Sequence, residues 1–248
     1  MKFYKPKFWD KRDRISLISI LLFPISLIII IKNYYEESKP KKNYYDFRTI
    51  CVGNIYIGGT GKTPLVNNLA NYLKKKNKTL IIKKNYFSHE DEKKMLEAKH
   101  KVIFEKTREE SLLKAEQEKA KIVIFDDGLQ EKTINYDLKI VCFNSLKLDG
   151  NGHVIPAGPL REKLNSLKNY DVVLINGNAN KETKNFIDKI KNINPDLKIF
   201  MGKYVPKNFS NFKKKKFLAF SGIGNPHTFF DTLKNLKIKL VDYKKFPD

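Results

Sequence analysis

The amino-acid sequence predicts an α/β protein in which a parallel sheet is covered by helices. Three observations lead to this prediction. A glycine-rich turn at residues 53–63 directly follows an apolar, β-branched run, strand-like and helix-like segments alternate beyond it, and an uncharged apolar run occupies residues 15–31. A glycine-rich turn between a strand and a helix is typical of P-loop NTPases, and such alternation is typical of parallel sheets. We therefore expect a P-loop NTPase-like parallel sheet, a second, incomplete α/β lobe and an N-terminal membrane-anchoring helix.

The composition permits a folded core but does not predict a nucleic-acid-binding surface. The chain has 248 residues, of which 41% are hydrophobic, and a formal net charge of +22. Only five of its 49 basic residues are arginine. Proteins that bind nucleic acids depend strongly on arginine for bidentate contacts. The excess of lysine is therefore weak support for an anionic partner, and we expect no nucleic acid.

The first expected element is a helix over the run from Ile15 to Ile31, in an N-terminal domain of residues 1–32. Such a helix would measure ~25 Å, slightly less than the ~30 Å hydrocarbon core of a bilayer. Pro24 lies in its middle and basic residues flank both ends, so the sequence leaves open whether the helix spans the bilayer or lies at its interface. We expect it to associate with a membrane; the alternative is a buried core helix.

Residues 33–46 are polar and contain Pro40, which predicts a linker. We expect two lobes, the P-loop lobe in a domain of residues 33–165 and the second lobe in residues 166–248. Predicted strands lie near residues 48–55, 79–83, 101–104, 121–126, 138–143, 171–176, 198–201, 216–221 and 238–242. Predicted helices lie near residues 63–76, 108–120, 181–192 and 226–236.

The glycine-rich turn predicts a binding site for a nucleoside triphosphate. Glycines allow successive backbone N–H groups to face one anion, a lysine ammonium reaches the β- and γ-phosphates, and a threonine hydroxyl can coordinate the accompanying Mg²⁺. Tyr56 departs from the usual pattern, which has a small residue at this position. We expect the nucleotide to bind at Gly58, Gly59, Thr60, Gly61, Lys62 and Thr63.

An apolar strand that ends in Asp126 and Asp127 predicts the metal-binding side of the same site. In P-loop folds the aspartate at the end of such a strand holds Mg²⁺ directly or through water. We expect Thr63, Asp126 and Asp127 to hold Mg²⁺. A GTPase is disfavoured, because the motifs Asp-x-x-Gly and Asn-Lys-x-Asp are not matched by 126–128 or by Asn180-Lys181-Glu182-Thr183.

Several motifs in order along the chain are together similar to those of the tetraacyldisaccharide 4'-kinase family. The resemblance spans residues 50–248, and the proline-rich run is specific to that family, whereas many families share the P-loop. The motifs are Val52-Gly53-Asn54, the segment 58–64, Asp126-Asp127-Gly128-Leu129-Gln130, Pro156-Ala157-Gly158-Pro159-Leu160-Arg161-Glu162, and Ser221-Gly222-Ile223-Gly224-Asn225-Pro226 with Phe229-Phe230.

The resemblance implies an ATP-dependent kinase of lipid A biosynthesis. Its substrate would be the 4'-hydroxyl of tetraacyldisaccharide 1-phosphate, and it would work on the inner membrane at the cytoplasmic face. Lys62 would stabilise the transferring phosphoryl group, Asp127 would hold Mg²⁺, and Glu162 would assist the metal or the substrate. Arg161 would contact phosphate or the lipid headgroup. Asp91, in His89-Glu90-Asp91-Glu92-Lys93, is the best match to the family's catalytic base.

The chain departs from the family at three places. Lys83-Lys84-Asn85-Tyr86-Phe87 replaces the family's Ser-Arg-Gly-Tyr-Gly segment, and Glu131 replaces a histidine. The chain ends at Phe246-Pro247-Asp248, and in the family a histidine that pairs with the catalytic aspartate follows Phe-Pro-Asp. We therefore expect a truncated or split form that binds Mg-ATP and phosphorylates lipid poorly or not at all. The alternatives are a degenerate nucleotide-binding P-loop protein at the membrane, and a P-loop synthetase or metal-cluster ATPase.

Overall fold

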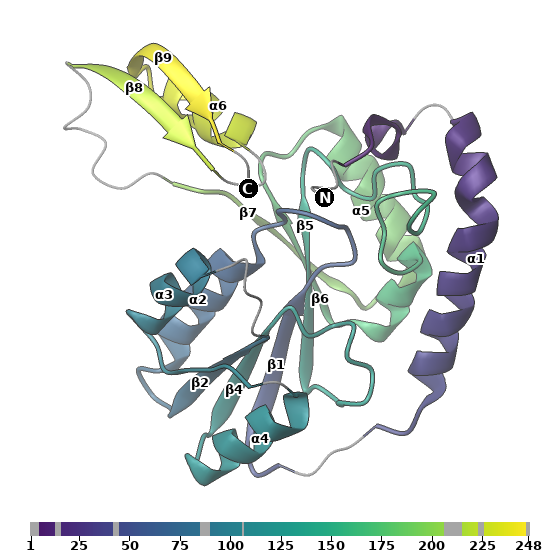
Figure 1. The fold of residues 1–248 in the computed structure, drawn as a ribbon, viewed down its shortest axis with the longest axis vertical. Helices are drawn as coiled ribbons and strands as arrows, with labels where there is room; N and C mark the ends of the chain where they lie inside the picture. The colour runs from purple at the N-terminus through teal and green to yellow at the C-terminus, as the bar shows by residue number, and fades with distance from the viewer. Residues whose placement is uncertain are drawn as a thin grey trace. The chain divides into compact units, whose positions relative to one another are not determined.

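The computed structural model describes residues 5–12, 16–41, 45–84, 90–105, 107–205, 215–222 and 226–246. The chain forms two compact units, Met1–Gly202 and Lys203–Asp248 (Figure 1).

The first unit is built on a parallel sheet of seven strands in the order β3-β2-β4-β1-β5-β6-β7. The predicted parallel α/β class is therefore confirmed. The strands are β1 (Arg48–Gly53), β2 (Thr79–Lys83), β3 (Val102–Ile103), β4 (Ile122–Asp126), β5 (Leu138–Asn144), β6 (Val172–Asn176) and β7 (Lys198–Gly202).

The strand order brings the ends of three strands together. The chain passes from β1 to β2 and β3 on one side, and later continues to β5 on the other side of β1. In such sheets ligands bind beyond the carboxyl ends of the strands where the order reverses. Asp126 of β4 lies opposite Val52 of β1 and Lys83 of β2, so these three strands end level with one another.

Helices cover both faces of this sheet. They are α2 (Lys62–Leu73), α3 (Glu90–Glu97), α4 (Arg108–Gln117) and α5 (Lys181–Ile193), with the 3₁₀-helix η2 at Leu164–Asn169. The expected capping box before α4 is present, because Thr107 Oγ1 accepts from the Glu110 N–H and the Glu110 carboxylate accepts from the Thr107 N–H. The sequence did not predict α3.

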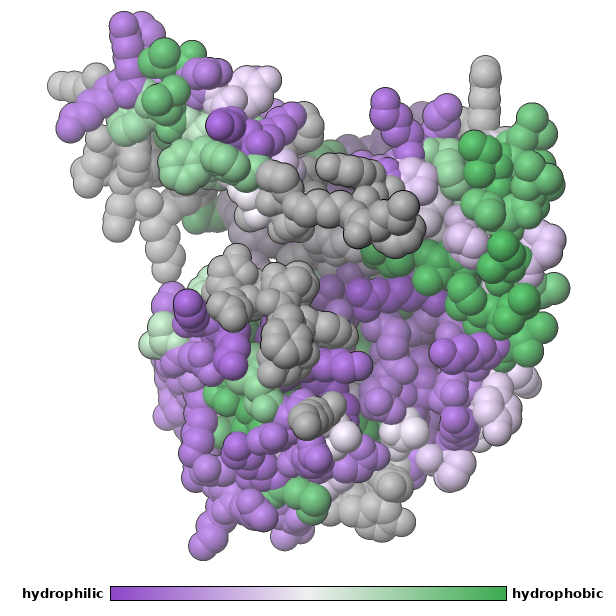
Figure 2. Space-filling model, in the orientation of Figure 1, coloured by the Kyte–Doolittle hydropathy of each residue, from purple (hydrophilic) through white to green (hydrophobic). Residues whose placement is uncertain are grey.

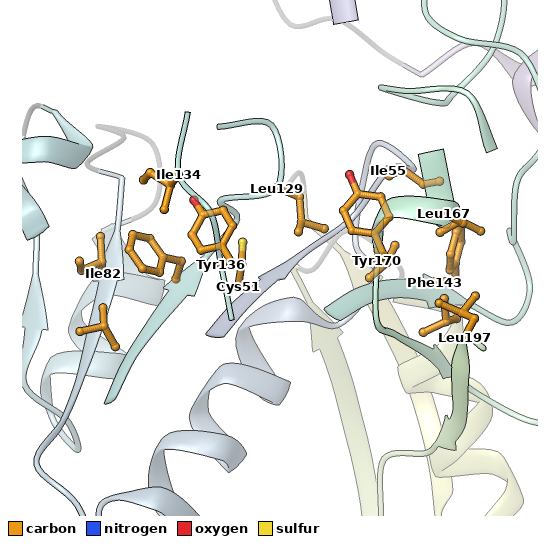
Figure 3. Packing of buried hydrophobic residues seen from close by; sticks show 14 of the residues in the cluster. Cys51, Ile55, Ile82, Leu129, Ile134, Tyr136, Phe143, Leu167, Tyr170 and Leu197 are labelled. Atoms are coloured by element: carbon orange, nitrogen blue, oxygen red, sulfur yellow. The ribbon is translucent and has the colours of Figure 1, made fainter. Parts of the chain in front are cut away.

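The two faces of the sheet carry separate apolar clusters, because successive side chains of a strand point to opposite faces. Cys51 of β1 belongs to the cluster that contains Leu112 of α4 and Phe186 of α5. Its neighbour Val52 belongs to the cluster that contains Val66 of α2. Figure 3 shows part of the first cluster around Cys51 and Tyr136. This burial on both faces explains the continuous apolar runs of the central strands.

The division between the units differs from the expected boundary at residues 165 and 166. Strands β6 and β7 pair in register with β5 and extend the first sheet, so the first unit ends at Gly202. Strand pairing depends on residues far apart in the chain, and local sequence does not reveal it. The second unit contains a parallel pair, β8 (Lys216–Ser221) and β9 (Lys239–Lys245), with α6 (Pro226–Asn235).

The N-terminal segment contains η1 (Lys7–Asp10) and α1 (Leu17–Ser38). The expected linker at 33–46 is wrong over its first residues, since α1 continues to Ser38. Asn33 explains part of this extension, because its Nδ2 donates to the Arg161 carbonyl at 2.8 Å. Within the described residues, α1 is the one helix that is long and apolar enough to cross a membrane.

Helix α1 directs small polar side chains toward the protein and large apolar side chains outward. Ser26 is buried, donates to the Val154 carbonyl at 2.9 Å and accepts from the Ala157 N–H at 3.0 Å. Leu17 and Leu21 are 78% and 77% exposed. Figure 2 shows the apolar surface that gathers over this helix. Only 11% of its most apolar window is buried, so the alternative of a core helix is wrong.

Candidate active site

The glycine-rich turn lies between β1 and α2, as the sequence predicts. Gly58 and Gly61 adopt φ angles of 119° and 85°, which disfavour any residue with a Cβ. Lys62 is the first residue of α2. The first backbone N–H groups of a helix have no partners within it, and the helix dipole favours an anion at this end. The turn thus presents an anion-binding helix terminus at the edge of the sheet.

Two asparagines hold this turn in place. Asn54 donates from Nδ2 to the Tyr56 carbonyl at 2.5 Å and to the Gly58 carbonyl at 3.1 Å. Asn176, the last residue of β6, donates to the Thr60 carbonyl at 2.6 Å. Both asparagines donate to carbonyl oxygens of the turn, so these contacts do not occupy its N–H groups.

Tyr56, which stands where the usual pattern has a small residue, contacts the N-terminal segment. Its hydroxyl donates to Asp10 of η1 at 2.6 Å and is also contacted by the Lys5 ammonium. The Tyr56 ring packs with Val154 and Leu160, against Ile29 and Ile30 of α1. A small residue would lose these contacts, so the side chain joins the turn to the chain's N-terminus.

Asp126 lies beside the turn, as predicted. Its Oδ2 accepts from the Thr63 hydroxyl at 3.3 Å and from Lys83 Nζ at 2.7 Å. Its Oδ1 is buried and has no protein hydrogen-bond partner among the described residues. A buried carboxylate oxygen without a partner is costly. Together with the threonine hydroxyl, it offers hard oxygen atoms of the kind that Mg²⁺ prefers.

Asp127 occupies a strained position next to the turn. Its φ of 63° lies in the left-handed region, and its N–H donates to the Val52 carbonyl at 2.8 Å. One carboxylate oxygen accepts from Arg161 at 2.9 Å and the other lies 3.7 Å from Lys62 Nζ. Burial lowers the pKa of the Lys62 ammonium, although Asp127 opposes this effect. The structure thus brings Lys62 and Asp127 together.

Arg161 reaches the site from the proline-rich run. Its guanidinium also donates to Gln130 Oε1 at 2.7 Å, while Gln130 Nε2 donates to the Asn54 carbonyl at 3.1 Å. The Arg161 N–H donates to the Ile55 carbonyl. Two motifs that are distant in sequence are therefore tied to the phosphate-binding turn through Gln130.

Glu162 lies next to Arg161 but has different partners. Lys132 Nζ contacts both its carboxylate oxygens, at 3.1 and 3.0 Å, and the Tyr170 hydroxyl donates to it at 3.0 Å. The glutamate is 4% exposed. Burial, reinforced by the charge of Glu162, raises the pKa of Tyr170 well above its usual value. Gln130 Nε2 also lies 3.5 Å from Glu162 Oε1. The contacts of Glu162 among the described residues thus support the proline-rich run and do not include Lys62 or Thr63.

Asp91 lies in α3, but its side chain is outside the part that the structure describes. Histidines with a described environment are His100, whose Nε2 lies 2.8 Å from Asn67 Oδ1, and His153, whose ring packs edge-on against Phe23. No group of three or more His, Cys, Asp or Glu side chains suitable for a metal occurs among the described residues.

Sequence reasoning missed Asn176, Lys83 and Arg108 as neighbours of the site. Arg108 donates to the Asp127 carbonyl at 3.2 Å. Asn176 and Lys83 are the polar last residues of apolar strands, which is the signal that could have found them. The carboxyl ends of parallel strands share one edge, and this rule would have placed both residues there.

Comparison with known protein families supports the resemblance noted above. A model of the family described as tetraacyldisaccharide-1-P 4'-kinase matches residues 17–91 and 83–248. The tetraacyldisaccharide 4'-kinase of Pelagibacter ubique (strain HTCC1062) is 47% identical over 251 residues, which cover 100% of this chain and 79% of that protein. The enzyme of the same name from Rickettsia canadensis (strain McKiel) is 36% identical over 266 residues, with the same coverage.

A solved structure shares the fold. The crystal structure of LpxK from Aquifex aeolicus in complex with ATP matches with a TM-score of 0.70 and 24% sequence identity, and the match covers 94% of this chain and 82% of that one.

Proposed function

This chain belongs to the tetraacyldisaccharide 4'-kinase family, and we propose that it transfers the γ-phosphoryl group of ATP to the 4'-hydroxyl of tetraacyldisaccharide 1-phosphate in lipid A biosynthesis. The observation that carries this proposal is the edge of the sheet where Lys62, Thr63, Asp126 and Asp127 meet. Phosphoryl transfer depends mainly on positioning and on electrostatic stabilisation, and these residues can supply both.

The turn binds the phosphates of ATP. Backbone N–H groups of Gly58, Gly59, Thr60 and Gly61 face the phosphates, at the positive end of α2. Lys62 donates to the β- and γ-phosphate oxygens and stabilises the charge that spreads over the transferring group. Arg161 and Lys62 both lie against Asp127, so an incoming phosphate meets two cations at this side of the turn.

Thr63, Asp126 and Asp127 hold Mg²⁺. The residues fit this ion, because the buried Asp126 Oδ1 lacks a protein partner and the Thr63 hydroxyl lies beside the same carboxylate. When bound, Mg²⁺ offsets the negative charge of the phosphates.

Asp91 accepts the proton of the 4'-hydroxyl, by resemblance to the family's catalytic base. Its place in α3 follows β2, whose last residue contacts Asp126. Glu162, through Lys132, keeps the proline-rich run in position, so that Arg161 stays within reach of phosphate or headgroup.

The chain works at the cytoplasmic face of the inner membrane. Support comes from α1, whose exposed apolar face would lie against the lipid while Ser26 hydrogen-bonds to Val154 and to Ala157 of the proline-rich run. An anchored enzyme meets an acylated substrate at high local concentration.

A transfer assay tests the proposed function. The purified chain is incubated with γ-³²P-ATP, Mg²⁺ and tetraacyldisaccharide 1-phosphate in mixed micelles, and the lipids are separated by thin-layer chromatography. We expect a labelled bisphosphorylated lipid, even if turnover is slow, and no label on a matched acceptor that already carries a 4'-phosphate. ATP binding without labelling of the acceptor would instead identify a nucleotide-binding protein without kinase turnover.

A further inference from the structure

Lys83 is a buried lysine at the candidate metal site. It is the last residue of β2 and lies opposite Asp126 of β4 in the register of the sheet. Its Nζ contacts Asp126 Oδ2 at 2.7 Å. Lys83 is 9% exposed and Asp126 is 1% exposed. This pair is therefore shielded from solvent and is screened little by salt.

The site contains two separate lysine–aspartate pairs. Lys62 lies 3.7 Å from Asp127, whereas Lys83 lies 2.7 Å from Asp126. The oxygen that Lys83 contacts also accepts from the hydroxyl of Thr63, the residue that would share the metal with Asp126. The other oxygen, Oδ1, is buried without a protein partner in the described structure. Lys83 and a bound cation would therefore share one carboxylate.

We propose that Lys83 takes the place of the metal's positive charge at Asp126 while Mg²⁺ is absent, so that the nucleotide can bind before its metal. This inference rests on the proposed function. A buried carboxylate without a counter-charge is strongly unfavourable, and it would also repel the phosphates of an incoming nucleotide. Lys83 removes both effects. The carboxylate of Asp126, held by Lys83 through Oδ2, would still offer Oδ1 to a cation.

Removing the ammonium has two opposite consequences. The uncompensated charge of Asp126 would attract a divalent cation more strongly in the absence of nucleotide. The same charge would repel ATP more strongly in the absence of metal. If the ion pair of Lys83 only stabilised the fold, a different pattern would be expected. Its loss would then lower the affinities for the cation and for ATP together, or would change neither.

Binding measurements on Lys83→Met test this assignment. Mn²⁺, used in place of Mg²⁺, is titrated without nucleotide and followed by electron paramagnetic resonance. ATP is titrated in excess EDTA and followed by calorimetry. We expect Lys83→Met to bind Mn²⁺ about tenfold more tightly and metal-free ATP about tenfold more weakly than the wild type, in line with the size of charge effects in partly buried sites.

Two further variants separate the role of the charge from folding. Lys83→Gln retains a donor for Asp126 but no charge, and is expected to show the same crossed change if Lys83→Met does not fold. Lys189→Met is the matched control, because Lys189 also contacts a buried carboxylate, that of Asp149, at 2.7 Å. It is expected to leave both affinities unchanged.

Three outcomes would overturn the inference: unchanged Mn²⁺ affinity in the folded Lys83 variants, affinities for Mn²⁺ and ATP that fall together, or a wild-type chain that binds ATP only when metal is present. The binding assays contain no lipid. A crossed change in a chain that does not label the lipid would therefore reject the proposed function and support the role of Lys83.

Discussion

The nucleotide edge of the sheet and the outer face of α1 depart from the usual distribution of polar and apolar groups in opposite directions. At the edge, the carboxylate of Asp126 is buried, and at α1 the side chains of Leu17 and Leu21 are largely exposed. Soluble proteins usually expose charges and bury large apolar side chains. The comparison teaches that each region supports a different part of the proposed function, the buried carboxylate a bound cation and the exposed apolar side chains a contact with lipid.

Helix α5 shows what the usual arrangement looks like in the same unit. Phe186 and Ile190 of α5 are buried, and Phe186 packs edge-on against Phe143 of β5 with ring centroids 4.9 Å apart. In α1 the buried side chains are instead Ser19 and Ser26. Both helices pack on the same unit. The two helices therefore differ in the surroundings that suit their outer faces, and an apolar outer face such as that of α1 marks an interaction site.

The largest effect is expected at the nucleotide edge. Lys62→Ala should reduce kcat by about 10³-fold, because it removes a preorganised positive charge worth roughly 4 kcal/mol in the transition state. The melting temperature should change little, since the lysine's described ion pair with Asp127 is long at 3.7 Å. Phosphoryl transfer and thermal unfolding are measured on the same preparation. Lys101→Ala, which alters an exposed lysine paired with Glu118, serves as the control, and a kcat near the wild-type value in Lys62→Ala would refute the P-loop role.

The second effect concerns the outer face of α1. Leu21→Glu combined with Ile28→Glu should lower partitioning onto anionic vesicles by about 10²-fold or more, because each buried leucine or isoleucine contributes roughly 1.5–3 kcal/mol. Both residues are exposed, at 77% and 68%, so the free energy of unfolding in solution should not fall. Vesicle sedimentation and chemical denaturation measure the two quantities. Equal partitioning of the variant and the wild type would show that α1 does not contact lipid.

The third effect separates the inner face of α1 from the outer face. Ser26→Ala should lower the free energy of unfolding by about 2 kcal/mol, since the buried Ala157 N–H would lose its acceptor. The Val154 carbonyl would lose the serine but keep the Gly158 N–H. Leu27→Ala, on a residue that is 44% exposed, should change stability by less than about 0.5 kcal/mol. Urea denaturation compares the two variants, and a reversed order would contradict the docking of α1 through its serines.

The smallest effect concerns Asp10, which links the N-terminal segment to the turn through Tyr56. Burial raises the Asp10 pKa, but hydrogen bonds from Lys147, Lys5 and Tyr56 outweigh it, and the pKa lies below its ordinary value of 3.8. The charged form is thus favoured in the folded state. Its contribution to stability is complete above pH 3.8 and is lost as the pH falls through the lowered pKa.

Asp10→Asn should therefore lower stability at neutral pH by about 1 kcal/mol or less, given the partial exposure of the carboxylate. It should also flatten the dependence of stability on pH below 3.8. Thermal unfolding of both proteins as a function of pH measures this difference. If the melting temperatures of the variant and the wild type fall identically below pH 3.8, the Asp10 contacts add nothing to stability.

The local signals in the sequence were sufficient to predict the parts of the site that are contiguous in the chain. The turn at Gly58–Thr63 and the pair Asp126 and Asp127 carry short motifs, and the structure places them at one edge. The roles proposed for these residues stay predictions. The role of Asp91 also stays a prediction, since its side chain lies outside the described residues.

The sequence by itself determined the elements whose physical cause is local: the apolar run that becomes α1, the glycines that accept positive φ, and the strands with their terminal carboxylates. Three features were decided only by the tertiary structure. They are the face of α1 that is exposed, the contact of Lys83 with Asp126, and the extension of the first sheet by β6 and β7 to Gly202. The physical reason is that hydrogen bonds and ion pairs such as those of Ser26 and Lys83 join residues 43 to 131 positions apart. Their partners are selected by packing, and neither composition nor periodicity in one segment contains that information.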